Sequence, residues 1–212
     1  MIDFDAIQRR KQEREERVKK FKDKKDKLVE FYKSRFLVRG YDQRNPILFD
    51  KLTEFCACYY SCVNRKGLFL CAKEKDVNTG IGKTLGMQVI GDIFTIRLEN
   101  VAKLSETYTE SHDRYLEMIT VPNYYRSTKK NDLIIDEVGA EPISNSYGKK
   151  LEVFIDILEN RYQSYTQKGS FTHFTSNLTP KEIENRYGHR VWSRINEMCT
   201  VIEISGKDSR FE

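Results

Sequence analysis

The segment Asn78-Thr79-Gly80-Ile81-Gly82-Lys83-Thr84 carries the strongest architectural signal in this chain of 212 residues. It follows the apolar run Gly67-Leu68-Phe69-Leu70-Cys71 and precedes a stretch whose apolar residues recur at helical spacing. A loop of small residues ahead of a helix turns consecutive backbone N–H groups toward one point, and the helix N-terminus adds a partial positive charge there. The segment therefore predicts a loop that binds a polyphosphate.

A second apolar run ends in two carboxylates, in the order Leu133-Ile134-Ile135-Asp136-Glu137. In a site for ATP, Lys83 reaches the β- and γ-phosphates and Thr84 places its hydroxyl on Mg²⁺. The acidic strand then delivers Asp136 to the metal and Glu137 to a water. A glycine turn beside an ordinary buried strand is the alternative. It leaves the acidic pair unexplained, because carboxylates beside a core strand are costly unless they are paired or bind a metal.

The loop departs from the usual P-loop pattern at one position. That pattern has a glycine five residues before the Gly-Lys pair, where this chain has Val77. The charged residues Lys73-Glu74-Lys75-Asp76 also lengthen the connection from the apolar run to the loop. We expect the fold to tolerate both features. They leave open a nucleotide-binding interaction module with little hydrolysis.

Length and composition fit one α/β domain with an appendage. Charged residues make up 33% of the chain, but the net charge is only +5 and the signs are interleaved, which permits nucleic-acid contact without requiring it. No apolar run approaches the about 18 residues of a membrane span, and the N-terminus lacks the apolar core of a signal peptide. We therefore expect a cytoplasmic protein that makes no membrane contact.

The first 40 residues differ from the rest and are expected to form a charged helical arm. Between Gln8 and Lys27 nearly every residue is charged or is glutamine, which favours a solvated helix with many opposite charges three or four residues apart. The first 30 positions hold 11 Lys and Arg against 8 Asp and Glu, a net charge of +3. That charge is too small to hold DNA firmly at physiological salt. Two interpretations stay open, a plain solvated helix and, more specifically, an arm that docks a partner protein.

Alternating helical and strand-like patterns follow in residues 41–212, after a break at Val38-Arg39-Gly40-Tyr41 and Asn45-Pro46. Such alternation predicts an α/β fold with a mostly parallel central sheet. We expect strands at 67–71, 94–98, 132–137 and 170–175, and helical segments at 47–62, 83–93, 100–119 and 151–165.

The C-terminal third contains three further motifs, Thr175-Ser176-Asn177-Leu178-Thr179, Gly188-His189-Arg190-Val191-Trp192-Ser193-Arg194-Ile195 and Asp208-Ser209-Arg210. Their order after the P-loop and the acidic strand resembles that of the AAA+ ATPases of the bacterial helicase-loader group. These are the DnaC and DnaI type, with transposition relatives of the IstB type. The resemblance covers roughly residues 45–212 and implies the three-layer sandwich of an AAA+ P-loop NTPase, preceded here by the charged arm.

The resemblance also implies roles at matching positions. Lys83 and Thr84 would be the Walker A residues, Asp136 and Glu137 the Walker B pair, Asn177 the sensor 1 residue, Arg194 or alternatively Arg190 the arginine finger, and Arg210 the sensor 2 residue. Each has a simpler alternative. Asn177 could cap the helix that begins after Thr179, and the two arginines could pair on the surface with Glu184 and Glu197.

A finger implies a homo-oligomer that forms when nucleotide is bound, because the guanidinium must cross an interface to reach a neighbour's γ-phosphate. A replicative helicase is the partner expected of a loader, and a transposase is the partner expected of an IstB-type protein. Trp192 and the twelve tyrosines offer stacking surfaces for single-stranded DNA. The motifs do not separate these partners, because both groups share the same catalytic residues.

Overall fold

The computed structural model describes residues 4–41, 45–61, 66–74, 80–120, 131–142, 144–146 and 149–206. Contacts divide the chain into two units, Met1–Arg65 and Lys66–Glu212. Of the expected site residues, Asn78, Thr79 and Arg210 lie outside the described residues, and so does Val77.

The first unit contains the helices α1 (Phe4–Lys22), α2 (Lys25–Val38) and α3 (Pro46–Tyr60). The arm is thus two helices rather than the one that the sequence predicted, because the chain turns at Asp23 and Lys24. Helix α3 starts with a cap in which Asn45 Oδ1 accepts a hydrogen bond of 3.0 Å from Leu48 N.

Helices α2 and α3 pack on each other through aromatic rings. The buried Phe36 of α2 lies edge-on to Phe49 of α3, with 6.2 Å between ring centroids. The sequence assigned α3 to a domain 41–212, whereas these contacts place it in the first unit. The domain limits 1–40 and 41–212 stay a prediction.

The second unit is built on one five-stranded sheet in which every neighbouring pair is parallel. Across the sheet the strands are β2 (Arg97–Asn100), β3 (Leu133–Val138), β6 (Thr172–Ser176), β1 (Gly67–Ala72) and β7 (Cys199–Ile204). All residues of β1 and β6 are buried, as expected of central strands that are covered on both faces. The mostly parallel sheet predicted from the sequence is confirmed.

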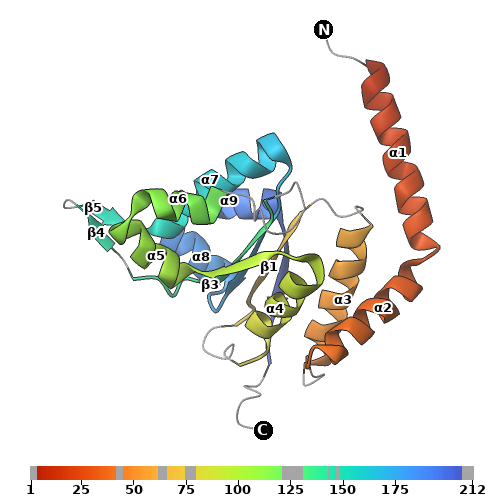
Figure 1. The fold of residues 1–212 in the computed structure, drawn as a ribbon, viewed down its shortest axis with the longest axis horizontal. Helices are drawn as coiled ribbons and strands as arrows, with labels where there is room; N and C mark the ends of the chain where they lie inside the picture. The colour runs from red at the N-terminus through yellow and green to blue at the C-terminus, as the bar shows by residue number, and fades with distance from the viewer. Residues whose placement is uncertain are drawn as a thin grey trace. The chain divides into compact units, whose positions relative to one another are not determined.

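Helices cover both faces of this sheet, which gives three layers (Figure 1). Helix α4 (Lys83–Phe94) lies on one face. On the other face lie α5 (Val101–Glu110), α6 (His112–Thr120), α7 (Val153–Lys168), α8 (Pro180–Tyr187) and α9 (His189–Met198). Their core contains edge-to-face rings, with Phe174 of β6 at 5.9 Å from Phe69 of β1 and 5.7 Å from Phe154 of α7.

Three element boundaries differ from those expected. Strand β2 begins at Arg97 rather than near residue 94, because α4 continues to Phe94 and ends at Thr95 in the left-handed conformation with φ 66°. The helical region 100–119 is two helices, separated by the extended Ser111. Leu151 lies in a strand, so the helix expected from residue 151 begins at Val153.

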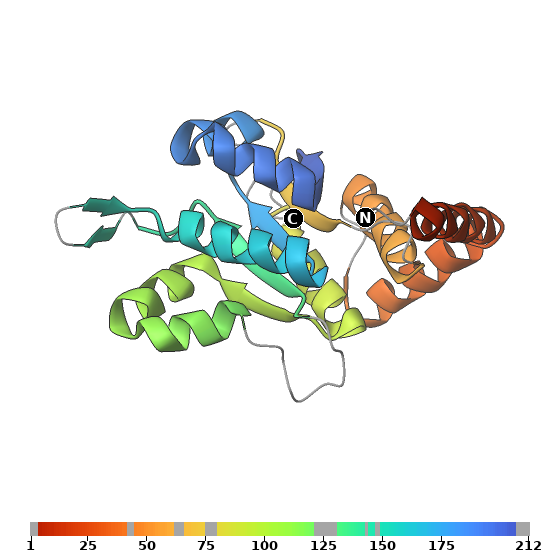
Figure 2. The same ribbon diagram turned by 90° about the horizontal axis from the view of Figure 1, so that it is seen from above.

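Two features of the sheet architecture were not expected. Strand β7 pairs with β1 along its whole length, from Gly67 opposite Cys199 to Ala72 opposite Ile204. The strands β4 (Ser144–Ser146) and β5 (Lys149–Leu151) form an antiparallel ribbon that projects from the rest of the second unit (Figures 1 and 2). Within the described ranges, no helix combines the length and the apolar character needed to cross a membrane.

Candidate nucleotide site

The carboxyl ends of β1 and β6 mark the place where a ligand is expected in this sheet. The connection from β1 leads through α4 to β2 at one edge, and the connection from β6 leads through α8 and α9 to β7 at the other edge. Neighbouring parallel strands whose connections leave in opposite directions open a crevice at their carboxyl ends, where ligands bind in open α/β sheets.

The loop that follows β1 reaches this crevice through two glycines. Gly80 and Gly82 have φ angles of 70° and 87°, and Gly82 is the N-cap of α4. Only glycine adopts this left-handed region without strain, so the Gly-Ile-Gly order is what the local backbone requires. Ile81 between them is buried and anchors the loop.

Lys83 is the first residue of α4 and is 6% exposed. Burial lowers the pKa of its ammonium group to about 8, although the nearby Asp136 carboxylate acts in the opposite direction. The positive end of the helix dipole disfavours a charged lysine at this position, and a bound anion relieves that repulsion. A buried lysine here is therefore expected to bind a phosphate group.

Two hydroxyl groups converge on one carboxylate oxygen at the end of β3. Thr84 Oγ1 donates to Asp136 Oδ1 at 3.2 Å, and Thr175 Oγ1 of β6 donates to the same oxygen. Burial raises the pKa of the Asp136 carboxyl group, and these two hydrogen bonds act against the rise. A threonine hydroxyl and a carboxylate in contact are oxygen ligands that suit Mg²⁺, so the donor set fits the predicted ion.

Glu137 interrupts the regular strand conformation of β3. It has a φ angle of 63°, its side chain is exposed between the buried Asp136 and Val138, and the register shifts at this point of the strand. Its backbone N donates to Thr175 Oγ1 at 2.9 Å. Left-handed backbone at a non-glycine residue is strained and is held by its surroundings, which is common at functional positions.

Asn100 at the end of β2 fixes the Glu137 side chain. Its Nδ2 donates to Glu137 Oε2 at 2.8 Å, and its Oδ1 caps α5 by accepting from Ala102 N at 2.9 Å. The two carboxylates of β3 thus have separate partners, since Asp136 is bonded to threonines and Glu137 to an asparagine.

Asn177 follows β6 directly, and its side chain is exposed. The alternative role considered for it, capping of α8, belongs to Thr179. Thr179 Oγ1 accepts from Glu182 N at 3.3 Å while Glu182 Oε2 accepts from Thr179 N at 2.9 Å, a reciprocal capping box.

The turn after Glu137 is tied to helix α8. Arg186 donates to the carbonyl oxygen of Gly139, to that of Glu141 at 2.9 Å, and to Glu152 Oε2 at 3.0 Å. The Glu141 side chain is buried and accepts from Gly139 N at 2.9 Å and from the Tyr187 hydroxyl. The segment that follows the acidic pair is therefore anchored to α8.

Arg190 and Arg194 lie on α9 and share a partner that the sequence did not suggest. Both pair with Glu159 Oε1 of α7, Arg190 through Nη2 at 3.6 Å and Arg194 through Nη1. The surface pairs proposed as an alternative are wrong for the described structure. Glu184 is 2.6 Å from His189 Nδ1, and Glu197 accepts from the Tyr162 hydroxyl at 2.9 Å.

Most of the expected site residues lie together at the carboxyl ends of the inner strands. Gly80, Ile81, Gly82, Lys83, Thr84, Asp136, Glu137 and Asn177 lie at or next to the carboxyl ends of β1, β3 and β6. Arg194 lies apart on α9. Sequence reasoning missed Thr175, Asn100 and Arg186, and only the first two carried a signal, as polar residues at strand ends. Among the described residues, no group of three or more His, Cys, Asp or Glu could hold a metal ion.

The fold is that of an AAA+ P-loop NTPase. A crystal structure of DnaI matches with a TM-score of 0.53 and 21% identity, over 73% of this chain and 84% of that chain. A DNA replication initiation factor matches with a TM-score of 0.50 and 14% identity, over 77% of this chain and 47% of that chain, so this chain spans about half of its length. No protein-family model and no curated protein sequence matches the chain.

Proposed function

We propose that this chain is an ATPase that binds ATP with Mg²⁺ and acts as a loader of a replicative helicase during DNA replication. The observation that carries the catalytic part is the contact between the Thr84 hydroxyl and the Asp136 carboxylate beside the head of α4. These residues are 52 positions apart in the sequence and meet where the fold predicts a ligand.

Each side chain at the sheet edge has a role in this proposal. The loop Asn78-Thr79-Gly80-Ile81-Gly82 donates backbone N–H groups to the phosphates, and Lys83 neutralises charge on the β- and γ-phosphates. A bound Mg²⁺, held by Thr84 and Asp136, would stabilise the charge that develops during phosphoryl transfer. Glu137 accepts a proton from the attacking water and Asn177 orients that water, as their exposed side chains at adjacent strand ends permit.

Hydrolysis is proposed to depend on assembly. At the carboxyl ends of the strands, as far as the structure describes them, one chain supplies the buried Lys83 and no arginine, so the transition-state charge is best balanced by Arg194 of a neighbouring subunit. Arg210 would sense the nucleotide from the C-terminal segment. A nucleotide-dependent homo-oligomer is the form in which we expect full turnover.

The helicase partner is supported by the order of the motifs and by the fold shared with DnaI. An IstB-type ATPase that acts with a transposase would use the same nucleotide site. Only the identity of the partner distinguishes this role from that of a helicase loader. A pull-down from cells that carry the gene tests this directly. Recovery of a hexameric helicase supports the loader, whereas recovery of a transposase replaces it.

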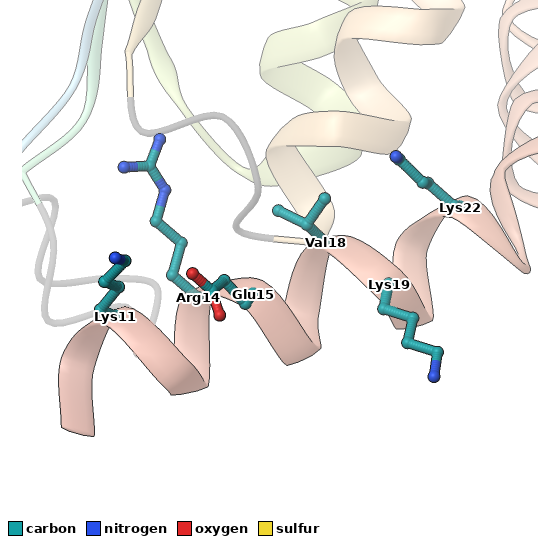
Figure 3. A pocket seen from close by; sticks show the side chains of 6 residues that line it. All are labelled: Lys11, Arg14, Glu15, Val18, Lys19 and Lys22. Carbon is teal, nitrogen blue, oxygen red and sulfur yellow. The ribbon is translucent and has the colours of Figure 1, made fainter. Parts of the chain in front are cut away.

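Helix α1 is the proposed docking element for that partner. A groove along α1 is lined by Lys11, Arg14, Glu15, Val18, Lys19 and Lys22 (Figure 3). Four of these six side chains are basic and one is acidic, and Val18 is half-buried among them. A protein surface with acidic residues around an apolar point fits this groove, since charge sets orientation and on-rate while the apolar contact adds affinity.

The nucleotide site is tested with two substitutions measured by calorimetry and by phosphate release. Lys83→Ala should abolish ATP binding, because it removes the cation at the loop. Glu137→Gln should bind ATP with Mg²⁺ as the wild type does but should not turn it over, because the amide cannot accept the proton. Equal ATP affinity in the wild type and Lys83→Ala would show that the assigned site is wrong.

The docking role of α1 is tested by reversing charges on one face. Lys11→Glu with Arg14→Glu should abolish recovery of the partner, whereas Arg9→Glu with Lys20→Glu makes the same change of charge on the opposite face and should not. A deletion that also tests this role is limited to residues 1–22, because α2 buries Tyr32 and Phe36. If the truncated protein keeps its partner but loses single-stranded DNA, α1 tethers nucleic acid instead.

A further inference from the structure

One carboxylate oxygen holds both candidate finger arginines. Glu159 Oε1 is in contact with Arg194 Nη1 and lies 3.6 Å from Arg190 Nη2. The two arginines are one helical turn apart on α9, and Glu159 faces them from α7. The single negative charge of Glu159 is therefore shared by two arginines of the same chain.

The two arginines differ strongly in exposure. The Arg194 side chain is 16% exposed and its Cζ lies 4.8 Å from the centre of the Tyr162 ring, while the Arg190 side chain is 75% exposed. The Tyr162 hydroxyl donates to Glu197 Oε2 at 2.9 Å, which fixes the ring under the guanidinium. Arg194 is thus enclosed by its own chain and does not project as a finger must.

The pair between Arg194 and Glu159 engages one nitrogen of the guanidinium. Arg194 Nη1 contacts Glu159 Oε1, whereas a guanidinium presents five N–H donors in a planar fork. A phosphate group in reach can accept from two of these donors at once.

We propose that Glu159 is a positioning residue that holds Arg194 in its own subunit until a neighbouring subunit's γ-phosphate replaces the carboxylate. This inference rests on the proposed function. In the unassembled chain Glu159 is the nearest anion and Arg194 stays enclosed. In the assembly, the more highly charged triphosphate competes for the same guanidinium, and Arg194 leaves Glu159 and the Tyr162 ring to reach it.

Arg190 makes the exchange feasible. An unpaired half-buried carboxylate is unfavourable, and Arg190 already lies near the same oxygen, so Glu159 keeps a counter-ion when Arg194 departs. Glu159 thus links turnover to assembly by competing with the neighbour's nucleotide for Arg194.

The test is ATP turnover as a function of protein concentration for the full chain. Glu159→Gln keeps the size of the side chain but removes the competing charge, and it should reach half-maximal turnover at a protein concentration lower by up to about fivefold, the range expected for a partly exposed ion pair. Glu197→Gln is the matched control, because it removes a negative charge from α9 while its amide oxygen can still accept from the Tyr162 hydroxyl and keep the ring in place. It should leave the concentration dependence unchanged.

Two further variants tie the effect to Arg194. Glu159→Asp, whose carboxylate is too short to keep the contact, should behave as Glu159→Gln does and replaces it if that variant folds poorly. The double variant Glu159→Gln with Arg194→Ala should show the low turnover of Arg194→Ala alone. Trp192, the single tryptophan of the chain, lies on α9 at 6.4 Å from the Phe69 ring, so unchanged fluorescence shows that α9 is still seated.

The outcomes separate this inference from the function on which it rests. A wild-type protein that does not hydrolyse ATP, or hydrolyses it equally at all concentrations, overturns both. Concentration-dependent turnover in the wild type with an unchanged or weaker dependence in Glu159→Gln overturns the role of Glu159 and leaves the proposed function standing. A gain that persists in the double variant also overturns it, because Glu159 would then act without Arg194.

Discussion

The side-chain amide of Asn100 joins the candidate catalytic glutamate to a helix start. Its nitrogen donates to Glu137 Oε2 at 2.8 Å and its oxygen accepts from Ala102 N at 2.9 Å. One planar group therefore holds the Glu137 carboxylate at a fixed place relative to α5. The left-handed backbone of Glu137 makes this support necessary, because strand geometry alone would direct the side chain elsewhere.

Replacement of Asn100 should separate its two roles. Asn100→Ala should lower the free energy of unfolding by about 1 kcal/mol through loss of the helix cap, whereas Asn100→Ser keeps a capping oxygen and most of that stability. Both should bind ATP normally and turn it over roughly tenfold more slowly, because Glu137 loses its orientation. Denaturant titration and phosphate release measure the two effects. Unchanged turnover in Asn100→Ser would show that Glu137 needs no support from Asn100.

Thr175 should matter for stability as well as for the site. Thr175→Val keeps the shape but leaves the Asp136 carboxylate and the Glu137 backbone N each without one buried partner. The free energy of unfolding should fall by about 1–3 kcal/mol, the range for an unsatisfied buried group. Thr175→Ser retains the hydroxyl and is the control. A Thr175→Val protein as stable as Thr175→Ser in urea unfolding would contradict the assigned bonds.

Arg186 should be among the most sensitive positions of α8. Arg186→Ala leaves the buried Glu141 carboxylate without its cation and frees the turn after Glu137, so we expect a loss of about 3–5 kcal/mol in unfolding free energy. Lys181→Ala removes an exposed charge from the same helix and should change stability by less than about 0.5 kcal/mol. Equal melting temperatures of the two variants would rule out the anchoring role.

Nucleotide affinity should depend on pH through Lys83. Burial lowers the pKa of Lys83 to about 8 from the usual 10.5, and bound phosphate favours its charged form. ATP binding should therefore take up a proton above about pH 8, and affinity should fall by up to about tenfold per pH unit there while staying constant near neutrality. Calorimetry in buffers of different ionisation enthalpy measures the uptake. Lys83→Arg stays charged and should show no such dependence.

The same shift has a defined effect on the nucleotide-free protein. Because the pKa in the folded state lies below that in the unfolded state, the folded chain loses its proton first as the pH rises. The contribution of Lys83 to stability therefore increases between about pH 8 and pH 10.5. In the Lys83→Met protein this contribution should be absent from the pH dependence of thermal unfolding.

Several features follow from the sequence because they are local. The apolar runs of β1 and β3 are buried, and such runs predict buried parallel strands without any knowledge of their neighbours. The Gly82-Lys83-Thr84 order likewise predicts a turn into a helix, since glycine alone accepts the required backbone angles. The strand-to-helix alternation then implies the α/β class.

Strand β7 could not be predicted from a local sequence pattern. It lies at an edge of the sheet, its middle residues are only partly buried, and its sequence lacks a continuous apolar run. Pairing with β1 supplies the hydrogen bonds that make it a strand. The packing of α3 on α2 is similar, because contacts between aromatic rings, rather than the spacing along either helix, join the two.

Side-chain partners were decided by the tertiary structure alone. The sequence by itself placed Asp136, Glu137 and Arg194 as functional candidates, but their contacts with Thr175, Asn100 and Glu159 depend on the register between strands and on helices that are distant in the chain. Arg161 makes the same point, since it is fully buried and donates to Thr172 Oγ1 at 2.8 Å, although nothing in its sequence context distinguishes it from Arg194. A charged side chain takes its properties from the groups that surround it, and those are known only once the chain is folded.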